Sequence, residues 1–192
     1  MANEEKVSIM EIRHHEADPS TVGLASFGIG LFVLSFINAG ILGKDAMSIM
    51  APLALMVGII HFFATLTGFR KNELFTALAF GIYGMFWFTF GLIQIFLALK
   101  CGFVPDPATW QVFFIAYTIF SGYLLIATFV TNVMVIITIA LLFLVFLLLD
   151  FGQGVWAGYV GIIDSLCALY ISAAGIINTM YGKTVLPVGP VS

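Results

Sequence analysis

Residues 110–149 read WQVFFIAYTIFSGYLLIATFVTNVMVIITIALLFLVFLLL, an apolar tract without an acidic or basic side chain. An α-helix rises about 1.5 Å per residue, so one helix over this tract would be roughly 60 Å long, about twice the thickness of the hydrocarbon layer of a membrane. The tract contains one clear polar break, TNV at residues 131–133. It therefore predicts two membrane-spanning helices joined by a tight turn.

The composition of the whole chain agrees with that prediction. Of its 192 residues, 61% are hydrophobic and only 9% are charged, whereas soluble domains carry about 25% charged residues. Such a chain cannot cover itself with a polar surface, so we expect an integral membrane protein whose outer side contacts the lipid bilayer. The formal net charge is -3 and the chain has no run of basic residues, which argues against nucleic acid as a partner.

Four further apolar runs complete the pattern. The polar stretches between them contain charges, and the stretch KCGFVPDP also contains two prolines that stop a helix. With the divided tract, the runs predict an all-α integral membrane domain of six transmembrane helices. We expect an N-terminal segment over residues 1–20, which lacks the apolar core of a cleavable signal peptide, and a C-terminal tail. The four runs are 21–42, 46–69, 74–99 and 155–181, the domain is 21–181 and the tail is 182–192.

Basic residues in the short loops predict the orientation, because cytoplasmic loops of membrane proteins carry an excess of Lys and Arg. If the N-terminus is inside, most of the basic residues lie on the cytoplasmic side, and an even number of spans returns the C-terminus to that side. We therefore expect a multi-pass protein of the cell membrane with both termini cytoplasmic. The inner side would carry Lys6, Arg13, Arg70, Lys71 and Lys183, and the outer side Lys44 and Lys100.

Small residues recur along the last predicted span at alternating intervals of four and three. This spacing places them on one side of a helix. In lipid, helices associate through close packing of such stripes rather than through the hydrophobic effect. The stripe indicates either tight packing within one subunit or a surface toward another subunit or a pore. Its members are Gly154, Gly158, Gly161, Ser165, Ala168, Ser172 and Gly175, and residues 74–99 carry a similar set, Ala77, Gly81, Gly84 and Gly91.

Several polar side chains fall at membrane depth, where an ionisable group is costly and normally faces a cavity or a partner. The position of His61 indicates either a hydrogen bond to a neighbouring helix or a role in a pore. The position of Asp164 indicates either a role in a pore or a pairing with a hydroxyl or a lysine of another helix. Asn38 lies near the outer end of the first span. The amides Gln94 and Asn178 lie nearer to the ends of their spans and are expected to contact solvent.

Two aromatic residues suggest a constriction at mid-membrane. Gly23, Phe27, Leu34 and Asn38 fall on one face of the first span, and Tyr83 has glycines nearby that let another helix come close. A phenyl and a phenol ring that meet there would form a narrow, mostly apolar constriction with one hydroxyl. Such constrictions can gate a pore by excluding water. Ordinary core packing explains the same pattern, because the chain contains 20 phenylalanines.

Three segments match the motifs of one protein family. ADPSTVGLASFG at residues 17–28 is similar to the signature Asn-Pro-Ala-Pro-Leu-Gly-Leu-x-x-Phe-Gly, and FRKNELFTALAFGIYGMFW at residues 69–87 is similar to a segment that ends in Tyr-Gly-x-Phe-Trp. YGKTVLPVG at residues 181–189 resembles the C-terminal motif Phe-Gly-Arg-Thr-Val-Leu-Pro-Ile-Gly. In order and spacing, almost the whole chain resembles the acetate uptake transporter family, which includes the bacterial succinate–acetate permeases.

The resemblance implies six helices around a central pore in each subunit and a homohexameric ring. It also implies transport of acetate and similar short monocarboxylates, with succinate in some members, by a channel or by symport with protons. The family's pore is narrowed by a Phe and a Tyr, which the motifs place at Phe27 and Tyr83, and by a Leu that no motif fixes. We choose Leu142 for it, with Ile137 as the alternative. Asn38 matches the Asn of a family Asn-x-Gly sequence and is expected to bind substrate.

The chain departs from the family pattern at positions that bear on selectivity. Asp18 stands where the family has Asn, although its carboxylate can still cap a helix. His61 occupies a position where relatives have Gln, and Asp164 is not a typical family residue. We expect His61 to bind substrate as a hydrogen-bond donor, most strongly when it is protonated. Because an imidazole has an ordinary pKa of about 6.5, His61 is also a candidate for proton coupling, and Asp164 is a second candidate. A neutral, hydrogen-bonding His61 is the alternative.

Other classes of function compete with carboxylate transport. A channel for a small neutral solute such as ammonia or urea would use a similar hydrophobic constriction. An enzyme is not expected, because the sequence has no His-Glu-x-x-His metal motif, no Gly-x-Ser-x-Gly motif and no paired carboxylates on one helix face. Cys101 and Cys167 form neither a metal motif nor a disulfide framework, and no cofactor is indicated.

Overall fold

The computed structural model describes residues 17–102 and 105–191. Within these residues, six helices are long and apolar enough to cross a membrane, which confirms the predicted all-α fold. Lys6, Arg13 and most of the N-terminal segment lie outside the described residues. The helices are α1 (Pro19–Asn38), α2 (Met47–Arg70), α3 (Leu74–Ala98), α4 (Pro107–Thr128), α5 (Val133–Asp150) and α6 (Gly154–Tyr181), and a 3-10 turn, η1 (Lys44–Ala46), precedes α2.

Capping residues explain where the helices begin and end. The side chain of Asp18 accepts a hydrogen bond from the backbone of the first turn of α1, and Pro19 occupies the first position of that helix. The side chain of Asn132 accepts a hydrogen bond of 3.0 Å from the backbone N–H of Val135, so the long apolar tract divides at its polar break. Gly182 ends α6 in the left-handed conformation, with φ of +61°.

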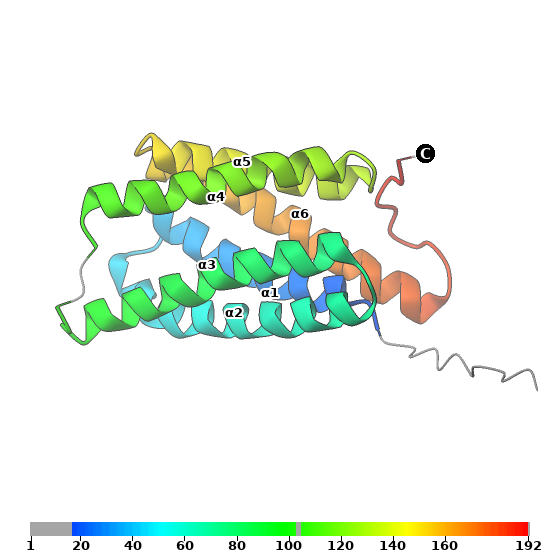
Figure 1. Cartoon of the computed structure of the whole chain (residues 1–192), viewed down its shortest axis with the longest axis horizontal. Helices are drawn as coiled ribbons and strands as arrows, with labels where there is room; N and C mark the ends of the chain where they lie inside the picture. The colour runs from blue at the N-terminus through cyan, green and yellow to red at the C-terminus, as the bar shows by residue number, and fades with distance from the viewer. Residues whose placement is uncertain (1–16, 103–104, 192) are drawn as a thin grey trace, which may run out of the picture.

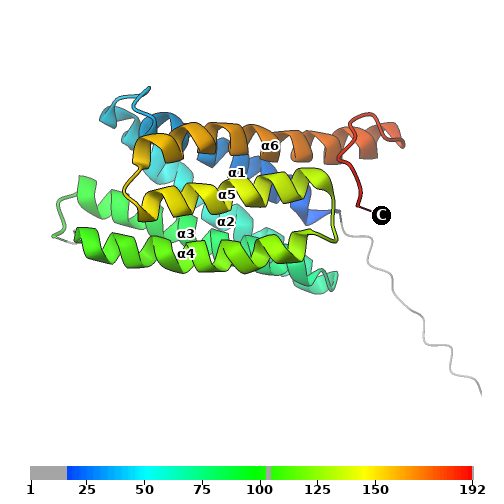
Figure 2. The same cartoon turned by 90° about the horizontal axis from the view of Figure 1, so that it is seen from above.

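The six helices run along the long axis of a single bundle (Figures 1 and 2). We call its two ends the Asp18 end and the Asp150 end. Helices α1, α3 and α5 begin at the Asp18 end, and α2, α4 and α6 finish there. The start of α1 and the C-terminal residues therefore lie at the same end of the bundle, as an even number of crossings requires.

The small residues of α6 pack against α1 of the same chain. A Cβ atom on Gly158 would lie 2.8 Å from the Cα of Ala39, and a Cβ on Gly161 would meet the hydroxyl of Ser35. Nearer the Asp18 end, the hydroxyl of Ser172 donates a hydrogen bond of 2.7 Å to a carbonyl in the first turn of α1. The stripe on α6 thus brings two backbones together within one subunit, which is the first of its two predicted meanings.

Helices α2 and α3 pack in the same way. A Cβ on Gly84 would lie 2.9 Å from the Cβ of His61, and a Cβ on Gly91 would lie 2.9 Å from the backbone carbonyl oxygen of Ala51. The small residues of α3 therefore press its backbone onto α2. Helix α5 differs, because it contains no glycine and contacts its neighbours through larger side chains.

The α1–α6 contact predicts a large difference between two glycines of α6. We expect Gly158→Ala to destabilise the protein by about 1–3 kcal/mol, because the added methyl group meets backbone atoms that cannot move aside. Gly154→Ala is the matched control, since nothing lies within 4 Å of a Cβ at that position. Thermal unfolding in detergent should give a lower Tm for Gly158→Ala and a nearly unchanged Tm for Gly154→Ala. Equal Tm values would contradict the packing described here.

Candidate functional site

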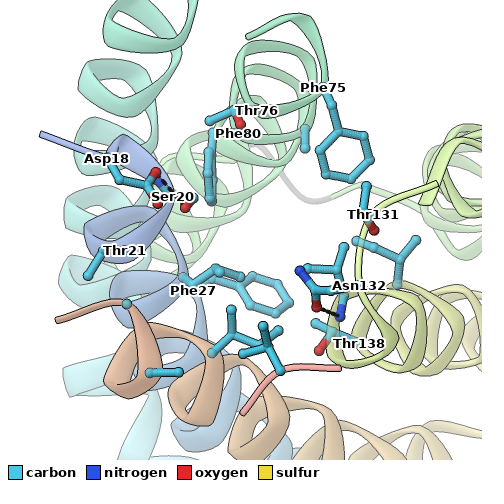
Figure 3. Close-up of a pocket in the computed structure, with 18 of the residues that line it drawn as sticks. Asp18, Ser20, Thr21, Phe27, Phe75, Thr76, Phe80, Thr131, Asn132 and Thr138 are labelled. Carbon is cyan, nitrogen blue, oxygen red and sulfur yellow. Dashed lines mark hydrogen bonds between the residues drawn. The ribbon is translucent and has the colours of Figure 1, made fainter. Parts of the chain in front are cut away.

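A cavity of about 440 Å³ lies in the bundle at the Asp18 end. We call it the vestibule. Figure 3 shows Phe27 and Phe80 on one side of it and Asn132 and Thr138 on the other. Most of its lining is apolar, with scattered polar groups, as is usual for sites that admit small molecules. The polar and ionisable lining residues are Asp18, Ser20, Thr21, His61, Thr76, Tyr83, Thr131, Asn132, Thr138, Asn178 and Thr179.

A second, smaller cavity of about 30 Å³ continues toward the Asp150 end. We call it the inner chamber, and it has room for about two water molecules. Phe27, Tyr83 and Leu142 line both the vestibule and the inner chamber, and they are the three residues expected to narrow the pore. The inner chamber is otherwise lined by Leu31, Leu34, Ser35, Asn38, Phe86, Trp87, Val145, Phe146 and Leu149.

Phe27, Tyr83 and Leu142, the constriction, are all buried and come from α1, α3 and α5. The ring centroids of Phe27 and Tyr83 are 6.4 Å apart. The hydroxyl of Tyr83 lies 2.9 Å from the hydroxyl of Ser121 on α4. Ser121 was not anticipated from the sequence, because no motif links it to Tyr83. This hydrogen bond fixes the phenol ring, so the hydroxyl of the constriction is already paired.

The structure distinguishes the two candidates on α5. Leu142 is 3% exposed, whereas Ile137 is 39% exposed and lines neither cavity. The outward position of Ile137 fits a side chain that faces lipid. Leu142 is therefore the residue of α5 whose position fits a gate, and its role as a gate stays a prediction.

His61 lies fully buried beside the constriction and lines the vestibule. Its Nε2 is 3.2 Å from the carbonyl oxygen of Gly23. Because a carbonyl only accepts hydrogen bonds, Nε2 carries the proton. The other ring nitrogen, Nδ1, has no hydrogen-bond partner among the described residues. A neutral His61 thus keeps one free acceptor near Phe27, whose ring centroid is 6.4 Å away.

The structure separates the other predicted polar residues. Asn38 lines the inner chamber, on the far side of the constriction from His61. Asp164 is 0% exposed, and neither of its carboxylate oxygens has a hydrogen-bond partner within the described part of the chain. It lines neither cavity. The two candidates for proton coupling therefore do not share a cavity lining. Asn178, expected to contact solvent, is half-buried and binds backbone groups of residues 185–186.

Charge is sparse along this path. No Lys or Arg is among the described residues that line the vestibule or the inner chamber. The carboxylate of Asp18 is the acidic group at the mouth, and it accepts hydrogen bonds of 2.8 and 2.6 Å from the backbone N–H and the hydroxyl of Ser20. The N-terminus of α1 offsets part of that negative charge. The polar groups of the described lining are therefore hydroxyls and amides, with the imidazole of His61 and the carboxylate of Asp18, and no fixed positive charge is among them.

Residues 2–192 match the model of the GPR1/FUN34/yaaH family. The chain is 29% identical over 182 residues to the succinate-acetate/proton symporter SatP of Escherichia coli strain K12. That alignment covers 90% of this chain and 95% of SatP. It is also 29% identical over 177 residues to ammonia transport outward protein 3 of Saccharomyces cerevisiae, which covers 86% of this chain and 64% of the yeast protein.

A solved structure resembles this one along nearly its whole length. The structure of the bacterial acetate channel SatP superposes with a TM-score of 0.85 and 27% sequence identity. The alignment covers 91% of this chain and 99% of the SatP chain. The six-helix arrangement is thus shared with a protein that forms a path for acetate.

The hydrogen bond at the constriction predicts different effects of two Tyr→Phe substitutions. Tyr83→Phe leaves the buried hydroxyl of Ser121 without its partner, which should cost about 1–3 kcal/mol of stability. Tyr117→Phe is the control, because the hydroxyl of Tyr117 is buried and has no partner among the described residues. Its removal should be neutral or stabilising. Thermal unfolding of both variants in detergent measures the difference in stability. A larger loss of stability for Tyr117→Phe would contradict the stabilising role of the Tyr83–Ser121 hydrogen bond.

Proposed function

The chain belongs to the GPR1/FUN34/yaaH family, and on that premise we propose that it transports acetate and related short monocarboxylates across a membrane. Membership confirms the identification made from the three sequence motifs. The observation that carries the proposal is that, among the described residues, only Phe27, Tyr83 and Leu142 line both the vestibule and the inner chamber. A single narrow passage between two cavities suits transport. The named relatives are transport proteins, so we infer a transporter rather than an enzyme.

The chemistry of the path supports a small carboxylate as the solute. Acetate needs an apolar zone for its methyl group, which Phe27 and Leu142 provide, and hydrogen-bond donors for its carboxyl group. Hydroxyls and amides of the vestibule supply donors before the constriction, and Asn38 supplies one beyond it. Succinate is a further candidate for the same path.

We also propose the surroundings in which this path works. The described Arg70, Lys71 and Lys183 belong to the Asp18 end, and Lys44 and Lys100 belong to the Asp150 end. By the excess of positive charge on the inside, the Asp18 end and both termini face the cytoplasm of the cell membrane. The hexameric ring rests on the family resemblance, and the exposed aromatic side chains of α2, including Phe62 and Phe63, offer an apolar surface to lipid or to a neighbouring subunit.

A channel for a neutral solute is the second candidate. The yeast relative is named for ammonia transport, and the linings of both cavities contain no Lys or Arg among the described residues. A neutral molecule would pass without any need for positive charge. Acetate distinguishes the two candidate functions. The flux of a neutral solute such as urea through a neutral-solute channel would be unaffected by added acetate.

Uptake of labelled acetate into proteoliposomes tests the proposed function. Protein-free vesicles are the necessary control, because undissociated acetic acid crosses lipid unaided. We expect protein-dependent uptake with and without an imposed pH gradient. Uptake equal to that of empty vesicles would overturn the acetate proposal and bring the neutral-solute channel forward.

The same vesicles test the constriction. We expect Leu142→Ala to raise the ratio of butyrate to acetate uptake several-fold, because removing the side chain widens the passage where the two cavities meet. Ile137→Ala is the matched control, since it deletes an exposed apolar side chain from the same helix. A ratio that changes equally in both variants would mean that Leu142 does not limit the width of the path.

Replacing His61 tests proton coupling, which we place on this residue. His61→Gln keeps a donor for the carbonyl of Gly23 but cannot take up a proton near neutral pH. We expect the variant to equilibrate acetate and to lose accumulation above the level that a pH gradient sets for the free acid. The ratio of inside to outside acetate at steady state measures this. If accumulation persists in His61→Gln and is lost in Asp164→Asn, the coupling group is Asp164 instead.

A further inference from the structure

The chain does not stop at the end of α6. After the left-handed turn at Gly182, it runs back along the Asp18 end of the bundle to the start of α5 (Figure 1). We call residues 185–191 the strap. The sequence predicted only a tail here, yet the strap makes hydrogen bonds with both α5 and α6.

Helix α6 holds the first half of the strap through two side chains. The amide of Asn178 donates a hydrogen bond of 2.8 Å to the carbonyl of Leu186 and accepts hydrogen bonds of 2.7 and 2.9 Å from the backbone N–H groups of Val185 and Leu186. The hydroxyl of Tyr170 donates one of 2.8 Å to the carbonyl of Pro187. Consecutive backbone groups are thus fixed, which a tail in free contact with solvent would not show.

The second half of the strap completes the N-terminus of α5. The first N–H groups of a helix have no partner within the helix. Here the N–H of Val133 donates to the carbonyl of Gly189 at 2.7 Å, and the N–H of Met134 donates to the carbonyl of Val188 at 3.2 Å. Gly189 has φ of +67°, and a Cβ there would lie 3.1 Å from the Cβ of Val133. A side chain at this position would therefore be both strained and crowded.

The strap also contributes to the path. Val188 lines the vestibule together with Asn132 and Thr138 of the α5 side and Asn178 of α6. The strap is bonded to both helices, so it bridges them at the mouth of the cavity. Without it, the vestibule would lose part of its lining between α5 and α6.

We propose that the strap is a wall of the vestibule that limits the size of the solute that enters. Its hydrogen bonds hold Val188 at the mouth, and unseating it opens the cavity between α5 and α6. That the strap forms a wall follows from its hydrogen bonds and from the place of Val188 in the lining, whereas its effect on solute size rests on the proposed function. A strap that only capped α5 would stabilise the helix without limiting access to the vestibule.

Cysteine labelling separates these two roles without relying on transport. The reporter is Thr138→Cys, because Thr138 lines the vestibule and is 2% exposed. The background carries Cys101→Ser and Cys167→Ser. A charged methanethiosulfonate reagent is added to the detergent-solubilised full chain, and the labelling rate is measured by mass spectrometry.

Two substitutions unseat the strap from different sides. Gly189→Val introduces a strained φ and a clash with Val133, and Tyr170→Phe removes the bond to Pro187 from a position that does not line the vestibule. We expect labelling to be roughly five to tenfold faster in Gly189→Val and about two to fivefold faster in Tyr170→Phe. Gly154→Val is the matched control, since a Cβ there meets nothing within 4 Å. Elution volume and helical circular dichroism verify that each variant is folded.

The outcomes bear on different claims. Unchanged labelling in both folded strap variants would overturn the proposal. Faster labelling together with a higher ratio of butyrate to acetate uptake in Gly189→Val would support it in full. Faster labelling with an unchanged ratio of butyrate to acetate uptake would overturn the claim that the strap limits the size of the solute. Faster labelling in a protein that moves no carboxylate at all would support the wall and reject the proposed function.

Discussion

The close approach of α1 and α6 is the contact on which the path depends. Lipid gives two apolar helices no hydrophobic reason to associate, so their contact must come from close packing and hydrogen bonds. The glycines of α6 let the backbone of α1 lie against it, and that contact sets the rotation of α1. Phe27 and the carbonyl of Gly23 lie on this helix, the first in the constriction and the second bonded to His61. A shift of α1 by one residue would turn both by about 100°, so the α1–α6 contact positions the ring of Phe27 and the buried imidazole together.

The six helices could be predicted from the sequence because lipid leaves a spanning chain few alternatives to the helix. The residues on α1 and α3 could be placed because motifs fix their register. Helix α5 is apolar on all sides, so no periodic pattern of apolar and polar residues distinguished Leu142 from Ile137. Only the fold shows which of the two faces the axis of the bundle. Ser121 pairs with Tyr83 across a separation of 38 residues that no local pattern records. Asn178 was expected to contact solvent because it lies near the end of a span, but the strap folds back over it, and the composition of a short tail does not reveal where that tail binds.

The sparse charge of the path bears on how a solute moves through it. A lining with Lys or Arg would hold a carboxylate firmly, and conduction requires binding that is weak enough for release. The described lining of the vestibule offers hydroxyls, amides and one imidazole, beside the carboxylate of Asp18 at the mouth. Such groups satisfy a carboxyl group by hydrogen bonds of modest net strength, so a solute can leave as readily as it enters.

The residues of the constriction are held with different stiffness. Phe27 and Tyr83 lie on α1 and α3, whose glycines or small residues pack backbone against backbone with α6 and α2. Leu142 lies on α5, which has no glycine and packs through side chains that can change rotamer. Hydrogen bonds hold α5 near its two ends, through the strap at Val133 and through Asp150, whose carboxylate accepts a bond of 2.7 Å from Thr118. The inner chamber, at about 30 Å³, has room for about two water molecules, so a larger solute can pass only if side chains that line it move. We infer that Leu142, between the two anchored ends of α5, is the part that moves most easily.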